Sequence, residues 1–374
     1  MKEKWQTQLQ HTKRLVVKVG TSTIAQPSGE LNIERVKSLV EELVESARER
    51  EVLLVTSGAI GIGATRLGLF AKPKTIPAKQ AAAAVGQGLL MQIYEKFFSE
   101  YGKVVAQVLL TRADLGDRHR YLNARNALNT LFSYDVIPIV NENDTVAVDE
   151  IKIGDNDTLA ANITALIDAD LLVILSDVDG LYTADPRADA GAQKIALVRE
   201  ITPQLERLAG SAGSAFGTGG MQTKLSAAQI ATKGGASMAI VDGAKSGNLV
   251  KLLSGQCSGT LFLPQAPLAG RKMWLAFNPP LCGKITVDEG AKEALLNYGK
   301  SLLPSGIVSC EDDFFPGDLV AICGPDGREF ARGLVNYEAA ELNQIKGLKT
   351  NQIEAVLGHR GYLEAIHRDN LVLL

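Results

Sequence analysis

The sequence predicts an α/β protein: a largely parallel sheet covered by helices on both faces, followed by a separate small β-rich module. Three observations support this fold class. Short apolar runs alternate with amphipathic helical stretches up to residue 263, which is typical of a parallel sheet between helices. A segment rich in proline and glycine then interrupts the pattern. Beyond it, turn signals separate short apolar runs, as in a β-rich module.

The elements of the first part follow one another in a regular order. The first predicted strand, residues 15–19, is rich in valine and ends at a Gly-Thr-Ser turn. A helix is expected at residues 33–48, because its apolar side chains recur on one face. The next strand is expected at residues 52–55. Further strands are predicted at 104–110, 136–140, 171–175 and 238–241, and further helices at 121–132, 158–167 and 221–232.

Residues 264–281 are expected to link two domains. Prolines and glycines gather there, at positions 264, 267, 270, 279 and 280. The first domain is therefore expected at residues 1–263 and the second at residues 282–374. In the second domain, residues 319–322 and 330–335 are predicted to form a hairpin around a Gly-Pro-Asp-Gly turn.

Composition excludes several classes of protein. With 39 Lys and Arg against 42 Asp and Glu, the formal net charge of −3 argues against a polyanion binder along the whole chain. The longest large-aliphatic run, residues 171–175, is far shorter than the roughly 20 residues of a membrane span. The first ten residues lack the apolar segment of a secretion signal. Cysteines and histidines do not cluster at metal-ligand spacing. We expect a cytoplasmic protein without a membrane span or a resident metal.

Polar or glycine-rich loops follow predicted strands or open predicted helices, which is where ligand sites gather in parallel α/β sheets. In residues 18–22, Lys18 lies beside a turn with exposed backbone N–H groups, which suits phosphate. The small side chains of residues 56–61 would let an anion approach the start of a helix. The alternative for residues 18–22 is an ordinary surface turn. The alternative for residues 56–61 is tight packing of the strand against the helix.

Two polar segments, residues 141–144 and 154–157, carry a carboxylate or amide at seven of eight positions. They could hold an amino group or orient cations, while Asp157 could also cap the helix that follows.

Two later loops offer further contacts. Residues 217–224 form a glycine-rich loop at the start of a helix, which suits phosphate, or else a mobile loop with an exposed lysine. Residues 176–187 follow the most apolar strand and form either a ligand loop or a polar surface turn.

In this order, the loops resemble the amino acid kinase family, in particular its bacterial members that phosphorylate glutamate. The resemblance covers nearly the whole chain and runs through residues 17–22, 57–60, 141–144, 154–157, 179–187 and 219–224. Residues 283–291 resemble the start of a PUA domain, a small β-barrel. The resemblance implies a three-layer α/β/α sandwich for the first domain.

The resemblance also implies an activity and a set of site residues. The activity is ATP-dependent phosphorylation of the γ-carboxylate of L-glutamate, the first step toward proline, with Mg²⁺ on ATP. The implied catalytic residues are Lys18, Lys224 and Asp157, and the implied glutamate-binding residues are Ser57, Asp144 and Asn156. The implied ATP site comprises Lys18, Ser176, Asp177, Thr218, Gly219, Gly220, Met221 and Lys224. The family commonly has threonine at position 176, and serine keeps the hydroxyl.

The residue types in these loops suit the phosphorylation of a carboxylate. The nucleophile is a carboxylate with a solution pKa of about 4.3, so it needs no general base at neutral pH. Two lysines on different loops suit the charge of a transferring phosphoryl group.

Two other functions remain open: an acetylglutamate or aspartate kinase, and an RNA-binding protein acting through the PUA-like module. The module's 9 Lys and Arg against 14 Asp and Glu disfavour RNA. The resemblance further suggests a homo-oligomer and feedback inhibition by proline.

Overall fold

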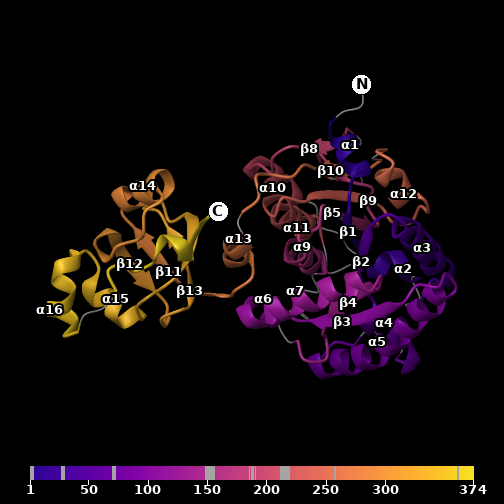
Figure 1. The fold of residues 1–374 in the computed structure, drawn as a ribbon, viewed down its shortest axis with the longest axis horizontal. Coiled ribbons are helices and arrows are strands. Elements are labelled where there is room, and N and C mark those ends of the chain that lie inside the picture. The colour runs from indigo at the N-terminus through magenta and orange to yellow at the C-terminus, as the bar shows by residue number, and fades with distance from the viewer. Residues whose placement is uncertain are drawn as a thin grey trace. The chain divides into compact units, whose positions relative to one another are not determined.

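The computed structural model describes residues 4–26, 30–69, 73–147, 156–184, 186, 189, 191–210, 220–256, 258–268, 270–359 and 362–374 (Figure 1). The chain divides into two units, Met1–Pro267 and Leu268–Leu374. Each unit has its own sheet. No helix in the described ranges is long and apolar enough to cross a membrane.

The first unit is built on an eight-stranded sheet with the order β3-β4-β2-β1-β5-β9-β10-β8. From β3 to β9 all neighbouring strands pair in parallel, whereas β10 runs antiparallel to β9. The strands are β1 (Arg14–Val19), β2 (Glu51–Val55), β3 (Val105–Leu110), β4 (Ile137–Glu142), β5 (Leu171–Ser176), β8 (Leu197–Val198), β9 (Ser237–Asp242) and β10 (Thr260–Phe262). The predicted parallel sheet is thus confirmed.

Helices cover both faces of this sheet (Figure 1). On one face, α3 (Ile33–Ser46), α5 (Ile76–Ser99) and α12 (Asn248–Leu253) share a buried core with alternate residues of β1 and β5. Successive strand residues point to opposite faces. The intervening residues, such as Val16 and Ile174, therefore face the other layer, where α9 (Asn156–Leu166) packs on β1 and β5. This α/β/α sandwich confirms the predicted fold class.

The predicted helices of this unit form within a few residues of their expected bounds, including α7 (Arg118–Ser133) and α11 (Met221–Lys233). Several elements were not predicted: α1 (Lys4–Gln10), α2 (Thr21–Ile24), α4 (Ala59–Arg66), α5, α6 (Arg112–Gly116), α10 (Pro203–Gly210), α12 and the strand pair β6 (Leu181–Tyr182) and β7 (Lys194–Ile195). The largest of these is α5, with 24 residues. Its alanine- and glycine-rich centre lacks a clear apolar period, which explains why periodicity does not reveal it.

Two glycines bring α4 and α5 into direct backbone contact. A Cβ atom at Gly63 would lie 1.7 Å from the carbonyl oxygen of Ala82, and one at Gly86 would lie 1.8 Å from that of Ala59. Neither distance leaves space for a side chain. The contact therefore sets the position of α5 relative to the start of α4, which directly follows the loop at Ser57 and Gly58.

The second unit contains a five-stranded sheet with the order β12-β11-β13-β14-β15. Its strands are β11 (Leu281–Val287), β12 (Ile307–Glu311), β13 (Leu319–Cys323), β14 (Glu329–Leu334) and β15 (Leu371–Leu373). Strands β13 and β14 form the predicted hairpin. The helices are α13 (Gly270–Phe277), α14 (Glu289–Tyr298), α15 (Ala339–Ile345) and α16 (Ile353–Leu357), with short 3₁₀ turns at Pro304–Gly306, Thr350–Gln352 and Arg368–Asn370.

The division between the two units lies inside the segment that the sequence predicts to be a linker. The sequence predicts a linker over residues 264–281, but the division lies between Pro267 and Leu268, and α13 forms inside that segment. Helix α13 packs on β14 and β15, where Arg332 donates a hydrogen bond to the Ala276 carbonyl over 2.6 Å. Prolines and glycines around a short amphipathic helix explain why the segment resembles a linker.

Candidate active site

The candidate site lies where the carboxyl ends of parallel strands meet the starts of two helices. Lys18 is the penultimate residue of β1, Asp157 is the second residue of α9, and Lys224 lies in the first turn of α11. Lys18 points toward the α9 face of the sheet because it shares that face with Val16. Three segments distant in sequence thus meet at one carboxylate.

Asp157 holds both lysines. Its Oδ1 atom lies 2.6 Å from Lys18 Nζ, and its Oδ2 atom lies 3.2 Å from Lys224 Nζ. The Thr223 hydroxyl lies 3.1 Å from Asp157 Oδ2 and 2.8 Å from the Gly220 carbonyl oxygen. The exposed fractions of Lys18, Asp157 and Lys224 are 8%, 1% and 5%, so this ion cluster is almost entirely removed from water.

The charge of the cluster is positive. Burial alone would raise the pKa of Asp157, but the two adjacent lysines outweigh it and lower the pKa to about 2. The carboxylate is therefore ionised at neutral pH and balances only one of the two ammonium groups. A buried surplus of positive charge at the carboxyl ends of strands suits a phosphoryl group.

A second cluster adjoins the first at the start of α9. Asn156 Nδ2 lies 2.8 Å from the Thr56 carbonyl oxygen, 2.8 Å from Ser57 Oγ and 3.1 Å from Asn141 Oδ1. These contacts join the ends of β2 and β4 to α9. The predicted residues Ser57 and Asn156 are thus brought into contact.

Asp144 lies in the turn after β4. Burial raises the pKa of its carboxyl group to about 6. A half-buried carboxylate with a raised pKa is an unfavourable place for charge unless a cation joins it. A carboxylate with a raised pKa at the end of a parallel strand is a candidate for a functional role.

Ser176 and Asp177 lie at the carboxyl end of β5, directly beside β1. Residue 174 of β5 pairs with Lys18, so Ser176 lies two residues beyond that pairing. Its buried hydroxyl lies 3.1 Å from Asp177 Oδ1 and accepts a hydrogen bond from the Val178 N–H over 3.4 Å.

The glycine-rich loop is described only at its end. Gly220 is the N-cap of α11, and a Cβ atom there would meet nothing within 4 Å among the described residues. Met221 begins the helix. The predicted ATP-site residues Thr218 and Gly219 lie outside the described residues.

Sequence reasoning missed three partners in these clusters: Thr223, the side chain of Asn141 and the carbonyl group of Thr56. Thr223 and Asn141 belong to polar segments that the sequence did single out. Thr223 directly precedes Lys224, and Asn141 directly follows a predicted strand, so both positions could have been recognised from the sequence. The Thr56 contact is made by a backbone carbonyl, which no residue type in the sequence indicates.

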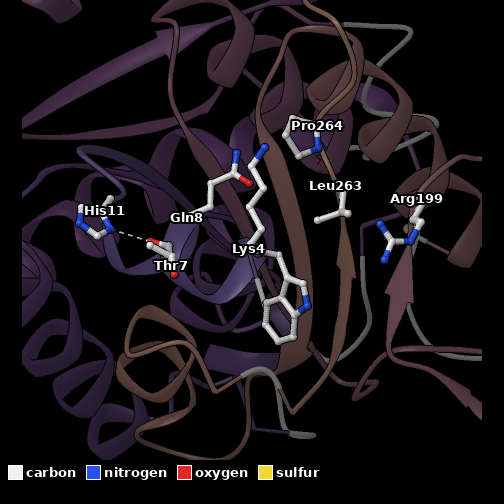
Figure 2. A pocket seen from close by; sticks show the side chains of 8 residues that line it. Lys4, Thr7, Gln8, His11, Arg199, Leu263 and Pro264 are labelled. Atoms are coloured by element: carbon white, nitrogen blue, oxygen red, sulfur yellow. Dashed lines mark hydrogen bonds between the residues drawn. The ribbon is translucent and has the colours of Figure 1, made fainter. Parts of the chain in front are cut away.

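A separate hollow lies beside α1 and the segment after β10 (Figure 2). It has a volume of about 960 Å³, and Lys4, His11 and Arg199 are among its lining residues. His11 Nδ1 lies 2.7 Å from the Thr7 carbonyl oxygen, as Figure 2 shows. This hollow shares no lining residue with the clusters around Asp157 and Asn156.

Two buried lysines on one carboxylate, at the strand ends of a parallel α/β sandwich, form the kind of site that suits phosphoryl transfer. Family comparisons agree: the amino acid kinase family model matches residues 13–242, and the PUA domain model matches residues 283–357. The chain belongs to the amino acid kinase family and carries a PUA domain.

Relatives resemble the chain over nearly its full length. It is 54% identical over 368 residues to a protein named glutamate 5-kinase from Moorella thermoacetica, which covers 98% of this chain and 97% of that protein. It is 53% identical over 363 residues to a glutamate 5-kinase from Thermoanaerobacter sp. (strain X514), covering 96% of this chain and 98% of that protein. It is 48% identical over 369 residues to one from Myxococcus xanthus, covering 98% of each chain.

Among solved structures, the carbamate kinase from Giardia lamblia bound to AMP-PNP is similar with a TM-score of 0.50 and 17% identity. The similarity covers 68% of this chain and all of that one, which supports the fold alone.

Proposed function

We propose that this protein phosphorylates the γ-carboxylate of L-glutamate with ATP as co-substrate, forming glutamyl 5-phosphate for proline biosynthesis. The observation that carries the proposal is the buried cluster in which Asp157 holds Lys18 and Lys224. The names of the full-length relatives support the choice of glutamate.

In the proposed reaction, a γ-carboxylate oxygen attacks the γ-phosphorus of ATP. A new P–O bond to glutamate forms, the bond to the bridging β,γ-oxygen breaks, and ADP leaves. No proton moves, because the carboxylate is already ionised. Lys18 and Lys224 stabilise the negative charge of the transferring phosphoryl group, and Asp157 orients both lysines.

Glutamate would bind at Ser57, Asp144 and Asn156. An ionised Asp144 would pair with the substrate's ammonium group, which offsets the cost of burying that carboxylate. Asn156 directly precedes Asp157 on α9, and Ser57 contacts Asn156, so both adjoin the residue that holds the two lysines. The substrate would thus lie between the end of β4 and the lysine cluster.

ATP would bind at Ser176, Asp177 and the loop from Thr218 to Lys224. The Gly220 backbone and the start of α11 suit phosphates, because helix N-termini bind anions. The neighbouring end of β5 would contact the rest of the nucleotide.

Mg²⁺ would enter with ATP. Across the described ranges, no three His, Cys, Asp or Glu side chains converge to hold a metal ion. Mg²⁺ keeps several waters and binds mainly through nucleotide phosphates, so it would need few ligands from the protein. When bound, the ion supplies further charge neutralisation on the phosphates.

ATP consumption with a panel of acceptors tests the proposed function. L-glutamate should support turnover, whereas L-aspartate, N-acetyl-L-glutamate and L-glutamine should not. L-glutamine is the sharpest control, because it differs only in the γ-group that would be phosphorylated. Turnover with acetylglutamate or aspartate alone would assign the site to a different kinase of the family.

Further expectations from the sequence stay proposals: a kinase domain ending near residue 263, inhibition by proline, a homo-oligomer, a cytoplasmic location and no nucleic-acid partner. An assay with added proline tests the inhibition, and gel filtration with light scattering tests the homo-oligomer.

A further inference from the structure

Helix α5 presents a row of polar side chains to the loops around the candidate site. Gln80, Gln87 and Tyr94 are spaced seven residues apart and so share one helix face. Gln80 Nε2 donates to the Ala147 carbonyl over 3.2 Å. Gln87 Oε1 accepts a hydrogen bond from Asn141 Nδ2 over 2.9 Å, and the Tyr94 hydroxyl lies 2.9 Å from Thr56 Oγ1.

Two of these contacts lead to the same amide. Asn141, held by Gln87, offers its Oδ1 to Asn156 Nδ2, and Thr56, held by Tyr94, offers its carbonyl oxygen to the same nitrogen. Since Asn156 Nδ2 is turned toward these acceptors, the Oδ1 atom of that amide must point away from them. Within the part of the chain that the structure describes, no donor bonds to that oxygen, so it can accept a hydrogen bond from a ligand.

The Gln87 contact sets which way the Asn141 amide faces. An acceptor at Gln87 selects the orientation in which Asn141 presents its nitrogen to α5 and its oxygen to Asn156. The exposed fractions of Gln87 and Asn141 are 9% and 2%, so water offers little competition for these bonds. The position of Gln87 is itself fixed, because the preceding Gly86 lies against the Ala59 carbonyl.

Gln87 is also an unfavourable residue for packing alone. Its Nε2 atom is buried without a hydrogen-bond partner in the part of the chain that the structure describes. An unsatisfied buried donor lowers stability, and an apolar side chain of the same length would avoid that cost. A glutamine at this position is therefore better explained by the acceptor that it supplies to Asn141.

We propose that Gln87 is a positioning residue for substrate binding, which acts through Asn141 to turn the Asn156 amide oxygen toward the ammonium group of the amino acid. This inference rests on the proposed function, because it assigns Asn156 to the glutamate site. Gln87 need not contact the substrate. Its effect should appear in glutamate binding and vanish when Asn156 is absent.

A double-mutant cycle on the full-length protein tests the inference. The Gln87→Met variant keeps the length of the side chain and removes the acceptor. Its glutamate KM should rise about tenfold with kcat within about twofold, because an interaction common to ground and transition states is lost. Gln92→Met, an exposed position on the same helix, is the matched control and should keep the wild-type KM.

The Asn156→Ala background decides whether Gln87 acts through Asn156. There, Gln87→Met should raise KM by less than about twofold more, because the residues act as one unit. Gln87→Glu keeps an acceptor for Asn141, and its KM should stay below that of Gln87→Met. Circular dichroism melting curves would separate these effects from loss of fold.

The outcomes are distinct. A wild-type KM for Gln87→Met, or multiplying effects in the double variant, would overturn the positioning role. A wild-type KM for Asn156→Ala would overturn it as well, together with the assignment of Asn156. Absence of glutamate turnover by the wild type would overturn the proposed function. The orientation of the Asn156 amide in crystal structures of the wild type and Gln87→Met would then decide the inference. The same amide orientation in both proteins would contradict it.

Discussion

The Lys18 ammonium group lies 2.6 Å from Asp157 Oδ1, which joins the end of β1 to the start of α9. Lys224 reaches the other oxygen of the same carboxylate from α11. One carboxylate therefore sets the separation and the direction of two positive charges. This arrangement prepares both charges before the substrate arrives, which is how electrostatic stabilisation lowers a barrier at little reorganisation cost.

Replacing either lysine should affect turnover more than glutamate binding. Lys18→Ala or Lys224→Ala removes charge that stabilises the transferring phosphoryl group, so kcat should fall about a hundredfold or more. The glutamate KM should change far less. Steady-state kinetics at saturating ATP check this, with the exposed Lys251→Ala as the control. A raised glutamate KM with an unchanged kcat would place the lysine in substrate binding instead.

Asp157→Asn should lower both stability and activity. The variant leaves two buried ammonium groups without a counter-charge, and the free energy of unfolding at pH 7 should fall by about 3 kcal/mol. Urea unfolding measures this difference. Since the folded pKa of Asp157 is lowered from 3.8 to about 2, its stabilisation is complete above the unfolded pKa and is lost as pH falls toward 2. The difference in the free energy of unfolding between the wild type and Asp157→Asn should decrease over that pH range. A difference that does not depend on pH would contradict the ion cluster.

Asp144 should show the opposite pH dependence of stability. Burial raises its folded pKa from 3.8 to about 6, so protonation stabilises the fold, and that stabilisation is lost as pH rises through 6. Without ligand, Asp144→Asn should be more stable than the wild type at pH 7.5, by on the order of 1 kcal/mol, and equally stable below pH 3.8.

The same carboxylate should control substrate affinity. The Asp144→Asn variant should bind glutamate at least about tenfold more weakly, since a charged hydrogen bond is lost. In the wild type, the glutamate KM should rise as pH falls below about 6. A pH profile of KM for both proteins decides this, because the variant should lack the rise. Equal profiles would remove Asp144 from the binding site.

The contact between α4 and α5 predicts a contrast between two glycines of one helix. Gly86→Ala would place a Cβ atom 1.8 Å from the Ala59 carbonyl oxygen, so the helices must separate and stability should fall by about 3 kcal/mol. At Gly88, a Cβ atom meets nothing within 4 Å, and Gly88→Ala should gain about 0.5 kcal/mol from lower chain entropy. Thermal melting of the two variants measures the contrast, and equal effects would contradict the packing.

Sequence alone predicted the central strands of the sheet well, because β1, β2, β4, β5 and β9 are largely buried on both faces and read as apolar runs. The short strands β8 and β10 were not predicted. Strand β5 was expected at residues 171–175 and forms Leu171–Ser176. Helix α5 was missed because its position depends on the contact through Gly63 and Gly86. Such a contact leaves no apolar periodicity in the sequence. Helix α13 was hidden among prolines of the expected linker.

The candidate site was partly predictable for a related reason. Strand ends and helix starts are visible in a sequence, and they marked Lys18, Asp157 and Lys224. Their meeting at one carboxylate depends on strand order, with β5 beside β1, which spacing along the chain does not encode. Gln87 and Tyr94 lay outside any motif, since their partners are side chains on other strands and loops.

The transfer of an oxygen atom from glutamate to phosphate tests the central claim most directly. L-Glutamate labelled with ¹⁸O in its γ-carboxylate would be incubated with ATP, Mg²⁺ and hydroxylamine, which attacks the acyl carbon and releases phosphate. The proposed reaction predicts that each released phosphate carries one ¹⁸O atom, seen as a shifted ³¹P resonance. Released phosphate without ¹⁸O would show that ATP is cleaved without attack by the γ-carboxylate, and would contradict the proposed function.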